Sequence, residues 1–210
     1  ATDSGDGGKV ITFATDVGNI FGELSATGGP NGGDGGFIET SAGALAVIQA
    51  PDAGAPAGEG GTWLIDPNNI EIVDAAPTYT NIDDNDGGDP LDGAADARPG
   101  GPGASIFQSA DDSAQIDDDI IELSLAGSDV LIRTAENGAD TQVGDITVSA
   151  SIDHPGGANN LTLVAHNDIV LDNNINFSGA GGTADVLLRA DGDGGANVPS
   201  DGTGEIRGAG

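Results

Sequence analysis

Residues 61–73 read GTWLIDPNNIEIV, two short apolar runs on either side of a polar turn. Proline fixes its own φ angle and the two asparagines tolerate left-handed backbone geometry, so Asp66-Pro67-Asn68-Asn69 predicts a tight connection. Residues 63–65 and 70–73 are rich in β-branched and aromatic side chains, which favour extended structure. This stretch therefore predicts two short strands joined at a polar corner.

The same alternation of short apolar runs and polar connections extends over most of the chain. No apolar spacing of three and four residues is sustained, and glycine or proline interrupts nearly every window, which argues against helices. Alternation within a run, as in Ile146-Thr147-Val148-Ser149, predicts one face toward a core and one toward water. We expect strands at residues 10–13, 20–24, 37–40, 45–48, 63–65, 70–73, 120–125, 130–133, 146–149, 161–165, 169–171, 175–177, 186–190 and 205–207.

Two all-β architectures fit these strands: an antiparallel sandwich or barrel, and a parallel β-helix, or β-solenoid. The very short strands, the small or aliphatic inward positions and the recurrence of Asn and Asp at corners favour the β-helix. At such corners, stacked side chains can hydrogen-bond between coils. Three strands of about five residues, joined by short turns, give roughly 20–25 residues per coil.

Residues 80–119 differ from the rest because they are rich in Asp, Gly and Pro and have little periodicity. Long connections without secondary structure are usually functional or disordered. We therefore expect one β-helix domain over residues 1–210, with N-terminal coils at 1–79, an acidic loop insert at 80–119 and C-terminal coils at 120–210.

The chain of 210 residues carries 35 acidic and 5 basic residues, a formal charge of −30. Nucleic acid is excluded as a partner because phosphate binding requires Lys and Arg, and anionic membrane surfaces are disfavoured. The sequence has no cysteine for disulfides, and no apolar run approaches the roughly 20 residues of a transmembrane helix. It also lacks Met and any signal peptide in residues 1–22, so we expect a processed product or a segment of a longer chain.

Several motifs follow one another in a characteristic order. They are DGGKVITFA (6–14), GELSATGG (22–29), GGFIETSAG (35–43), the stretch 61–73, GDITV (144–148), NLTL (160–163), AHNDI (165–169) and VLLRAD (186–191). In these motifs and their order, the chain resembles the filamentous haemagglutinin-like large exoproteins, the passengers of bacterial two-partner secretion.

The resemblance implies a right-handed parallel β-helix that forms an extended stalk or fibre on the bacterial cell surface. It implies a secreted protein that contributes to attachment, aggregation or contact with other cells, with a cell surface, matrix or glycan as partner. Descriptions of the family often add haem utilisation. The chain departs from the family in its strong acidity, in its Asp-rich insert and in lacking the N-terminal secretion domain, so the resemblance supports stalk material rather than a binding tip.

Calcium is the candidate cofactor, because hard divalent cations bind several oxygen ligands at once. Neither of the two acidic clusters has EF-hand spacing, and solvated acidic loops are the alternative interpretation. GGDGG at 32–36 and DGDGG at 191–195 are similar to a Gly/Asp calcium-binding nonapeptide, without a tandem array. The calcium candidates are Asp83, Asp84, Asp86, Asp89 and Asp92, with a second cluster at Asp117, Asp118 and Asp119.

His154 and His166 are the only candidates for haem or a soft metal, and exposed or corner-packing histidines are the simpler interpretation. Trp63 either stacks on a sugar or fills one end or side of the coil stack, and we prefer the second. Enzymatic β-helices need paired carboxylates in a groove, and basic residues to hold an acidic polysaccharide. Basic residues are nearly missing, so we do not expect an enzyme.

We therefore expect a structural segment of a secreted surface fibre or adhesin. Its end coils carry unpaired edges, so copies could dock head to tail into filaments. The alternative is a calcium-dependent glycan-binding module on a β-helix scaffold, and a polysaccharide lyase or hydrolase is a third class.

Overall fold

The computed structural model describes residues 1–15, 17–74, 82–83, 108–109, 113–135, 142–179, 183–191 and 204–208. Strands dominate these residues, accompanied by one short helix. No helix in the described ranges is long and apolar enough to cross a membrane.

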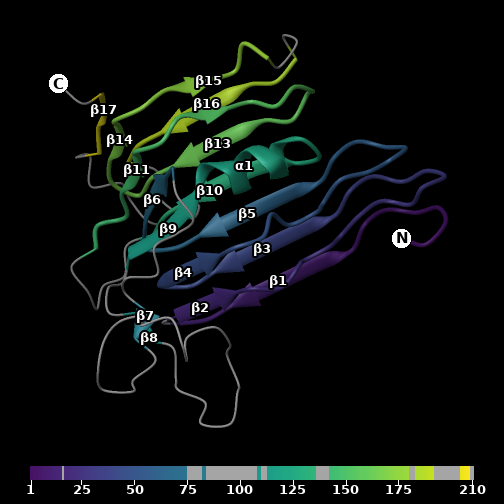
Figure 1. Cartoon of the computed structure of the whole chain (residues 1–210), viewed down its shortest axis with the longest axis horizontal. Helices are drawn as coiled ribbons and strands as arrows, with labels where there is room; N and C mark the ends of the chain where they lie inside the picture. The colour runs from purple at the N-terminus through teal and green to yellow at the C-terminus, as the bar shows by residue number, and fades with distance from the viewer. Residues whose placement is uncertain are drawn as a thin grey trace.

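The largest sheet has six parallel strands in the order β1-β3-β5-β10-β13-β16. Figure 1 shows them stacked in chain order, from purple β1 to yellow-green β16. Their bounds are β1 (Lys9–Phe13), β3 (Phe37–Ser41), β5 (Thr62–Asp66), β10 (Asp129–Arg133), β13 (Leu161–Val164) and β16 (Val186–Arg189).

A second parallel sheet has five strands in the order β17-β14-β11-β6-β9. These are β6 (Asn69–Val73), β9 (Ser113–Asp117), β11 (Ile146–Val148), β14 (Ile169–Leu171) and β17 (Ile206–Gly208). Three smaller pairs complete the set: β2 (Val17–Ile20) with β4 (Ala44–Val47) and β12 (Ile152–Asp153) with β15 (Ile175–Asn176), both parallel, and β7 (Ile82–Asp83) with β8 (Gln108–Ser109), antiparallel.

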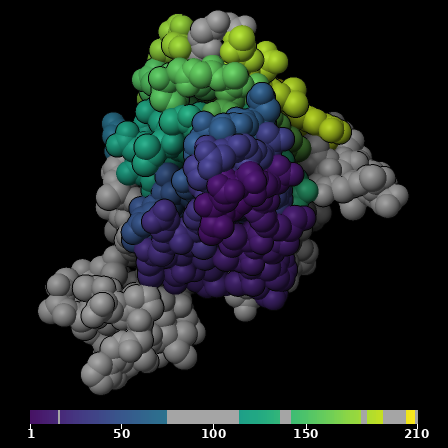
Figure 2. All heavy atoms as spheres, turned by 90° about the vertical axis from the view of Figure 1, so that its right-hand side faces the viewer, coloured from purple at the N-terminus to yellow at the C-terminus, as the bar shows by residue number. Residues whose placement is uncertain are grey.

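We call each strand of the six-stranded sheet, with the chain that follows it up to the next such strand, a layer. In Figure 2 the N-terminal layers lie at one end of the molecule and the C-terminal layers at the other. Ile146 pairs with Ile169, 23 residues later, and Leu161 with Val186, 25 residues later. The prediction of short β-strands is confirmed, and the parallel pairing does not fit the antiparallel sandwich or barrel.

The core forms because alternate side chains of the stacked strands point to the same side. Equivalent positions in successive strands pair in register, so apolar side chains stack into rows. One such row contains Ile38, Trp63, Val130 and Leu161, and another contains Ile65, Ile132 and Leu163, all buried. One hydrophobic cluster includes residues that precede and residues that follow the acidic segment.

The expected strand at residues 120–125 is wrong, because these residues belong to helix α1 (Asp118–Leu125). Asp117 caps the helix by accepting a hydrogen bond from the backbone N–H of Asp119 at 3.0 Å. Two acidic residues in the first turn suit the positive end of the helix dipole. Ile121 and Leu125, four residues apart, lie on one face and are buried.

Residues 113–119, the last part of the expected acidic insert, belong to strand β9 and to the start of helix α1. Strand β9 (Ser113–Asp117) already pairs in parallel with β6, and it also contacts β4. In the five-stranded sheet, β9 therefore lies beside β6 on the side that faces the N-terminal layers, although β9 follows β6 in sequence. The expected strand at 20–24 is misplaced as well, since β2 covers Val17–Ile20.

Paired glycines precede the first three strands of the six-stranded sheet, at 7–8, 35–36 and 60–61. A Cβ atom on Gly36 would lie 2.0 Å from the carbonyl oxygen of Gly8, and one on Gly61 would lie 1.9 Å from that of Gly36. Successive layers therefore approach at these corners more closely than any side chain allows. The approach permits backbone hydrogen bonds between layers, such as Gly35 N–H to the Glu59 carbonyl, at 2.8 Å.

Gly61→Ala should destabilise the protein because its methyl group meets backbone that cannot move aside. We expect a loss of at least the ~1–3 kcal/mol typical of overpacking, measured by urea unfolding followed through the fluorescence of buried Trp63. Gly8→Ala is the matched control, since nothing lies within 4 Å of its Cβ position. Equal stability of the two variants would contradict the close approach of the layers.

Candidate functional site

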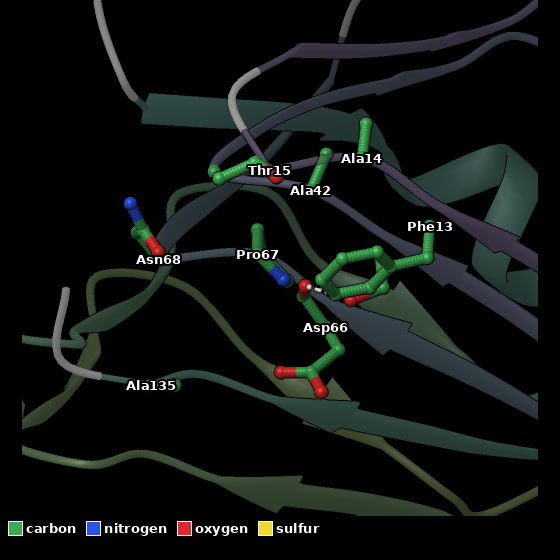
Figure 3. Close-up of a pocket in the computed structure, with 10 residues that line it drawn as sticks. Phe13, Ala14, Thr15, Ala42, Asp66, Pro67, Asn68 and Ala135 are labelled. Carbon is green, nitrogen blue, oxygen red and sulfur yellow. Dashed lines mark hydrogen bonds between the residues drawn. The ribbon is translucent and has the colours of Figure 1, made fainter.

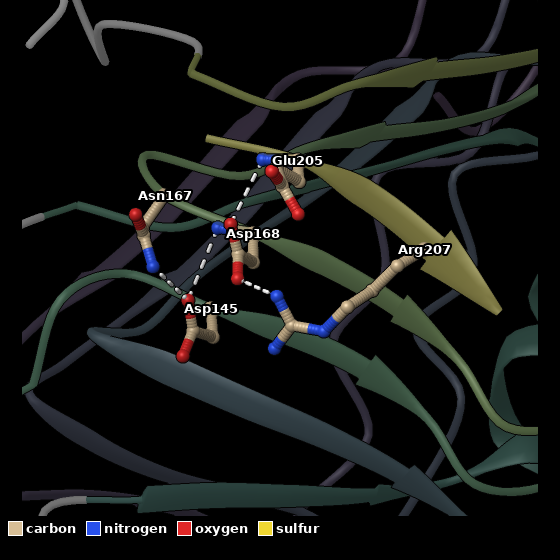
Figure 4. Close-up of polar contacts among 5 residues, drawn as sticks. All are labelled: Asp145, Asn167, Asp168, Glu205 and Arg207. Carbon is tan, nitrogen blue, oxygen red and sulfur yellow. Dashed lines mark hydrogen bonds and ion pairs between the residues drawn. The ribbon is translucent and has the colours of Figure 1, made fainter. Parts of the chain in front are cut away.

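A ladder of polar side chains runs along the corner that precedes the strands of the five-stranded sheet (Figure 4). It starts at Asn69, whose Oδ1 accepts hydrogen bonds from the backbone N–H groups of Gly144 and Asp145, at 2.9 and 2.8 Å. Asp145 in turn accepts from the N–H of Asp168 at 3.0 Å, and Asp168 accepts from the N–H of Glu205 at 2.8 Å. Each side chain thus binds the backbone of the next layer.

The last step of this ladder carries an ion pair between Asp168 and Arg207. The hydrogen bond from the Arg207 guanidinium to the Asp168 carboxylate raises the pKa of Arg207 above its ordinary range. Asn167 also donates from Nδ2 to Asp145 Oδ1 at 2.7 Å. The Oδ1 atoms of both aspartates are therefore engaged in holding β14 and β17 in place, which is a structural arrangement rather than a catalytic pair.

A second ladder borders the six-stranded sheet. Asp34 donates its backbone N–H to Asp6 Oδ1 at 3.0 Å, and Glu59 donates its N–H to Asp34 Oδ1 at 2.9 Å. In the C-terminal layers, the Asn160 N–H binds Asp129 Oδ1 at 2.7 Å, and the Asp185 N–H binds Asn160 Oδ1 at 2.8 Å. Side chains of successive layers also bind each other directly: Asn160 Nδ2 donates to Asp129 Oδ1 at 3.2 Å, and Asn176 Nδ2 donates to Asp153 Oδ1 at 2.8 Å. The predicted hydrogen bonding between stacked Asn and Asp side chains is confirmed.

A hollow of about 230 Å³ lies beyond the carboxyl ends of β1, β3 and β5 (Figure 3). Phe13 forms one wall and is 74% exposed, whereas Ala42 and Pro67 contribute apolar surface. Asp66 is the one ionisable residue among its described lining residues, and it is paired with Arg133. The hollow therefore offers an aromatic face beside polar groups, not a pair of acid and base groups.

Of the predicted calcium ligands, the structure describes Asp83 and the cluster Asp117, Asp118 and Asp119. Asp83 lies in β7, where its backbone pairs with Gln108, while Asp84, Asp86, Asp89 and Asp92 lie outside the described residues. Asp117, Asp118 and Asp119 form the end of β9 and the start of α1. No group of three or more possible metal ligands occurs among the residues that the structure describes. Calcium binding stays a prediction.

The two histidines take positions at corners. His154 is 5% exposed; its Nδ1 accepts from the Gly156 N–H at 3.0 Å, and its Nε2 lies 2.9 Å from the Asn159 carbonyl. Its ring also packs against Phe177, with 4.5 Å between ring centres. His166 is half-buried, with Nδ1 3.1 Å from the Val143 carbonyl. Both roles are those of corner-packing residues.

Trp63 is 0% exposed, so the sugar-stacking interpretation is wrong. Its indole Nε1 donates to Thr40 Oγ1 at 3.1 Å, which satisfies the polar atom inside the core. The preferred interpretation, a large residue that fills the stack, holds with one correction. Trp63 lies on β5, within the six-stranded sheet rather than at its end.

Sequence reasoning missed an acidic pair one turn apart on α1. Burial, followed by the nearby Glu122 carboxylate, raises the pKa of Asp118 to about 6. Burial also raises the pKa of Glu122, whose Oε1 accepts a hydrogen bond from the Asp153 N–H at 2.6 Å and so joins α1 to β12. The spacing of four residues was visible in the sequence, but it carries meaning only on a helix.

No protein-family model matches the chain, and no curated protein matches it.

Asp118→Asn tests the raised pKa. Because the folded state holds this proton up to about pH 6 and the unfolded chain releases it near 3.8, the wild type loses stability as pH rises between these values. The free energy of unfolding of Asp118→Asn minus that of the wild type, measured by urea unfolding, should be larger at pH 8 than at pH 4, because only the wild type loses stability over this range. Asp119→Asn controls for removing one charge from the same turn. An equal difference at both pH values would contradict the assignment.

Asp145→Ala tests the ladder. The change leaves the Asp168 N–H and the Asn167 amide without their acceptor, at an expected cost of about 1–3 kcal/mol. Asp145→Asn keeps an acceptor oxygen and should retain most of the stability. Asp172→Ala, at an exposed corner, serves as the control in the same chemical denaturation series. If Asp145→Ala were as stable as this control, the ladder would not contribute to the fold.

Proposed function

We propose that this chain is a right-handed parallel β-helix and that it serves as a structural segment of a secreted bacterial surface fibre or adhesin. The observation that supports this most is the uninterrupted parallel register of the six-stranded sheet. Backbone hydrogen bonds join each layer to the next, so the number of layers sets the length of a rod. A mechanical element of this kind needs no reactive site.

The charge of the chain fits a fibre in a salty, divalent-rich medium. With a net charge of −30, the sides of neighbouring rods repel each other until salt or cations screen them. The partners in attachment are another cell surface, matrix or glycan, as the resemblance to the filamentous haemagglutinin-like exoproteins implies. The exterior of the bacterial cell is the proposed location.

Immunogold labelling of intact cells tests the location and the fibre together. Antibodies raised against the purified 210-residue chain should label filaments that extend from unpermeabilised bacteria. Labelling only after permeabilisation would reject the proposal. Beads coated with the chain should increase attachment to host or bacterial cells relative to beads coated with Gly61→Ala.

Glycan binding is the second candidate function, and the hollow beside Phe13 favours it. An exposed aromatic ring next to polar groups is a surface on which a sugar ring can stack. The calcium-dependent form of this function rests on Asp83, Asp84, Asp86 and Asp89. A glycan array with and without chelator separates the cases, because binding that survives chelation would support the hollow without calcium.

Pulling the molecule by its ends should release it layer by layer. Each layer of the regular regions holds about 25 residues, so each step should lengthen the chain by about 80–90 Å. Single-molecule force spectroscopy measures these steps. One release of the whole chain, without intermediate steps of this size, would contradict the role of the layers as mechanical units.

A further inference from the structure

The two outer strands of the six-stranded sheet each have one unoccupied side. β1 pairs with β3 and β16 pairs with β13, and no strand in the described ranges pairs with their other sides. Each outer strand therefore presents backbone N–H and C=O groups that an additional parallel strand could bind. Natural sheets usually blunt such edges, yet β1 exposes Ile11 (54%) and β16 exposes Leu187 (55%).

The register between neighbouring strands is continuous across the whole sheet. Val10 is in register with Ile38, then Trp63, Val130, Leu161 and finally Val186. Ile11 follows the same path to Leu187, one residue further along each strand. The two outer strands therefore present equivalent positions, which lets β16 of one molecule continue onto β1 of another without a shift.

We propose that β16 of one copy of this chain pairs in parallel with β1 of a second copy, in this continued register. The proposal rests on the proposed function, because it supplies the contact by which rods lengthen. It places Asp185 opposite Lys9, Val186 opposite Val10, Leu187 opposite Ile11, Leu188 opposite Thr12 and Arg189 opposite Phe13.

The side chains brought together by this register are complementary. Exposed Asp185 meets Lys9, the one lysine of the chain, so opposite charges lie across the contact. Leu187 and Ile11 cover each other's apolar surface. The Arg189 guanidinium lies opposite the exposed ring of Phe13, an arrangement that permits a cation–π interaction.

The pairing joins different surfaces of the two copies, so it cannot close on itself in a pair. Each addition leaves a new free β16 and a new free β1, and the product is an open filament. The charge of −30 on each copy opposes this growth. Association should therefore strengthen with added salt, since the Debye length shortens from about 10 Å at 0.1 M to about 3 Å at 1 M.

Sedimentation velocity and electron microscopy of the 210-residue chain, over a concentration series at low and high salt, test the pairing. The wild type should form end-to-end oligomers whose length grows with concentration and salt. Leu187→Asp should weaken association at least about tenfold, because it puts a charge against Ile11. Leu123→Asp is the matched control, because Leu123 is an exposed side chain on α1, away from both outer strands. This variant should associate like the wild type.

A charge exchange tests the register itself. Lys9→Asp and Asp185→Lys should each weaken association, and the double variant should restore it, which a loss of folding could not do. In the same experiment, Trp63 fluorescence and thermal unfolding test whether every variant folds. A wild type that stays monomeric throughout, a control as defective as Leu187→Asp, or a double variant without rescue would overturn the pairing. Monomers combined with surface labelling of the bacteria would reject this contact alone and leave the fibre proposal standing.

Discussion

The structure depends on one constraint: equivalent backbone positions of successive layers must pair in parallel at the spacing of a sheet, about 4.8 Å. At this spacing, side chains that face the core stack on their own counterparts. Rows such as Ile65, Ile132 and Leu163 satisfy the constraint because aliphatic side chains of similar width fill each level. The same spacing requires that the corners between layers be narrow.

The corners meet this requirement in two ways. Near the N-terminal end, glycines such as Gly36 and Gly61 remove the side chain and let the backbones touch. In the C-terminal layers, Asp145, Asn160 and Asp168 keep a short side chain and use its oxygen to bind the next layer's N–H. Both arrangements give hydrogen-bond partners to backbone N–H and C=O groups at the corners, which lie outside the pairing of the strands. They also explain why a chain rich in Gly, Asp and Asn forms an ordered stack.

Much of this fold could be predicted from the sequence, because period-two alternation identifies strands such as Ile146–Val148 and Leu161–Val164 directly. Helix α1 could not, since its run of apolar residues is short and the cap at Asp117 is clear only once the helix is known. Strand β9 was hidden by its acidic surroundings. The repeat GDGG, GDGG, GEGG at 5–8, 33–36 and 58–61 marks in the sequence the corners where the first layers approach each other.

The candidate site followed the same pattern. The sequence predicts that Asn and Asp side chains form hydrogen bonds at the corners. It does not predict the individual partners of Asp145 and Asp168, because these depend on the register between neighbouring strands. The prediction that Asp83 and its neighbours bind calcium came only from their clustering in the sequence. Clustering is a weaker guide to a site than the position of a residue in a layer. The hollow beside Phe13 brings together residues from strands 25 and more positions apart, so no local pattern could indicate it.

The most direct test measures distances between spin labels on successive strands. Labels at Glu39 and Leu131, Glu39 and Thr162, and Glu39 and Leu187 occupy one row of the six-stranded sheet, two, three and four strands apart. Parallel layers in register predict label separations that rise by about 4.8 Å per strand. Separations that do not increase in this order would contradict the stacked arrangement.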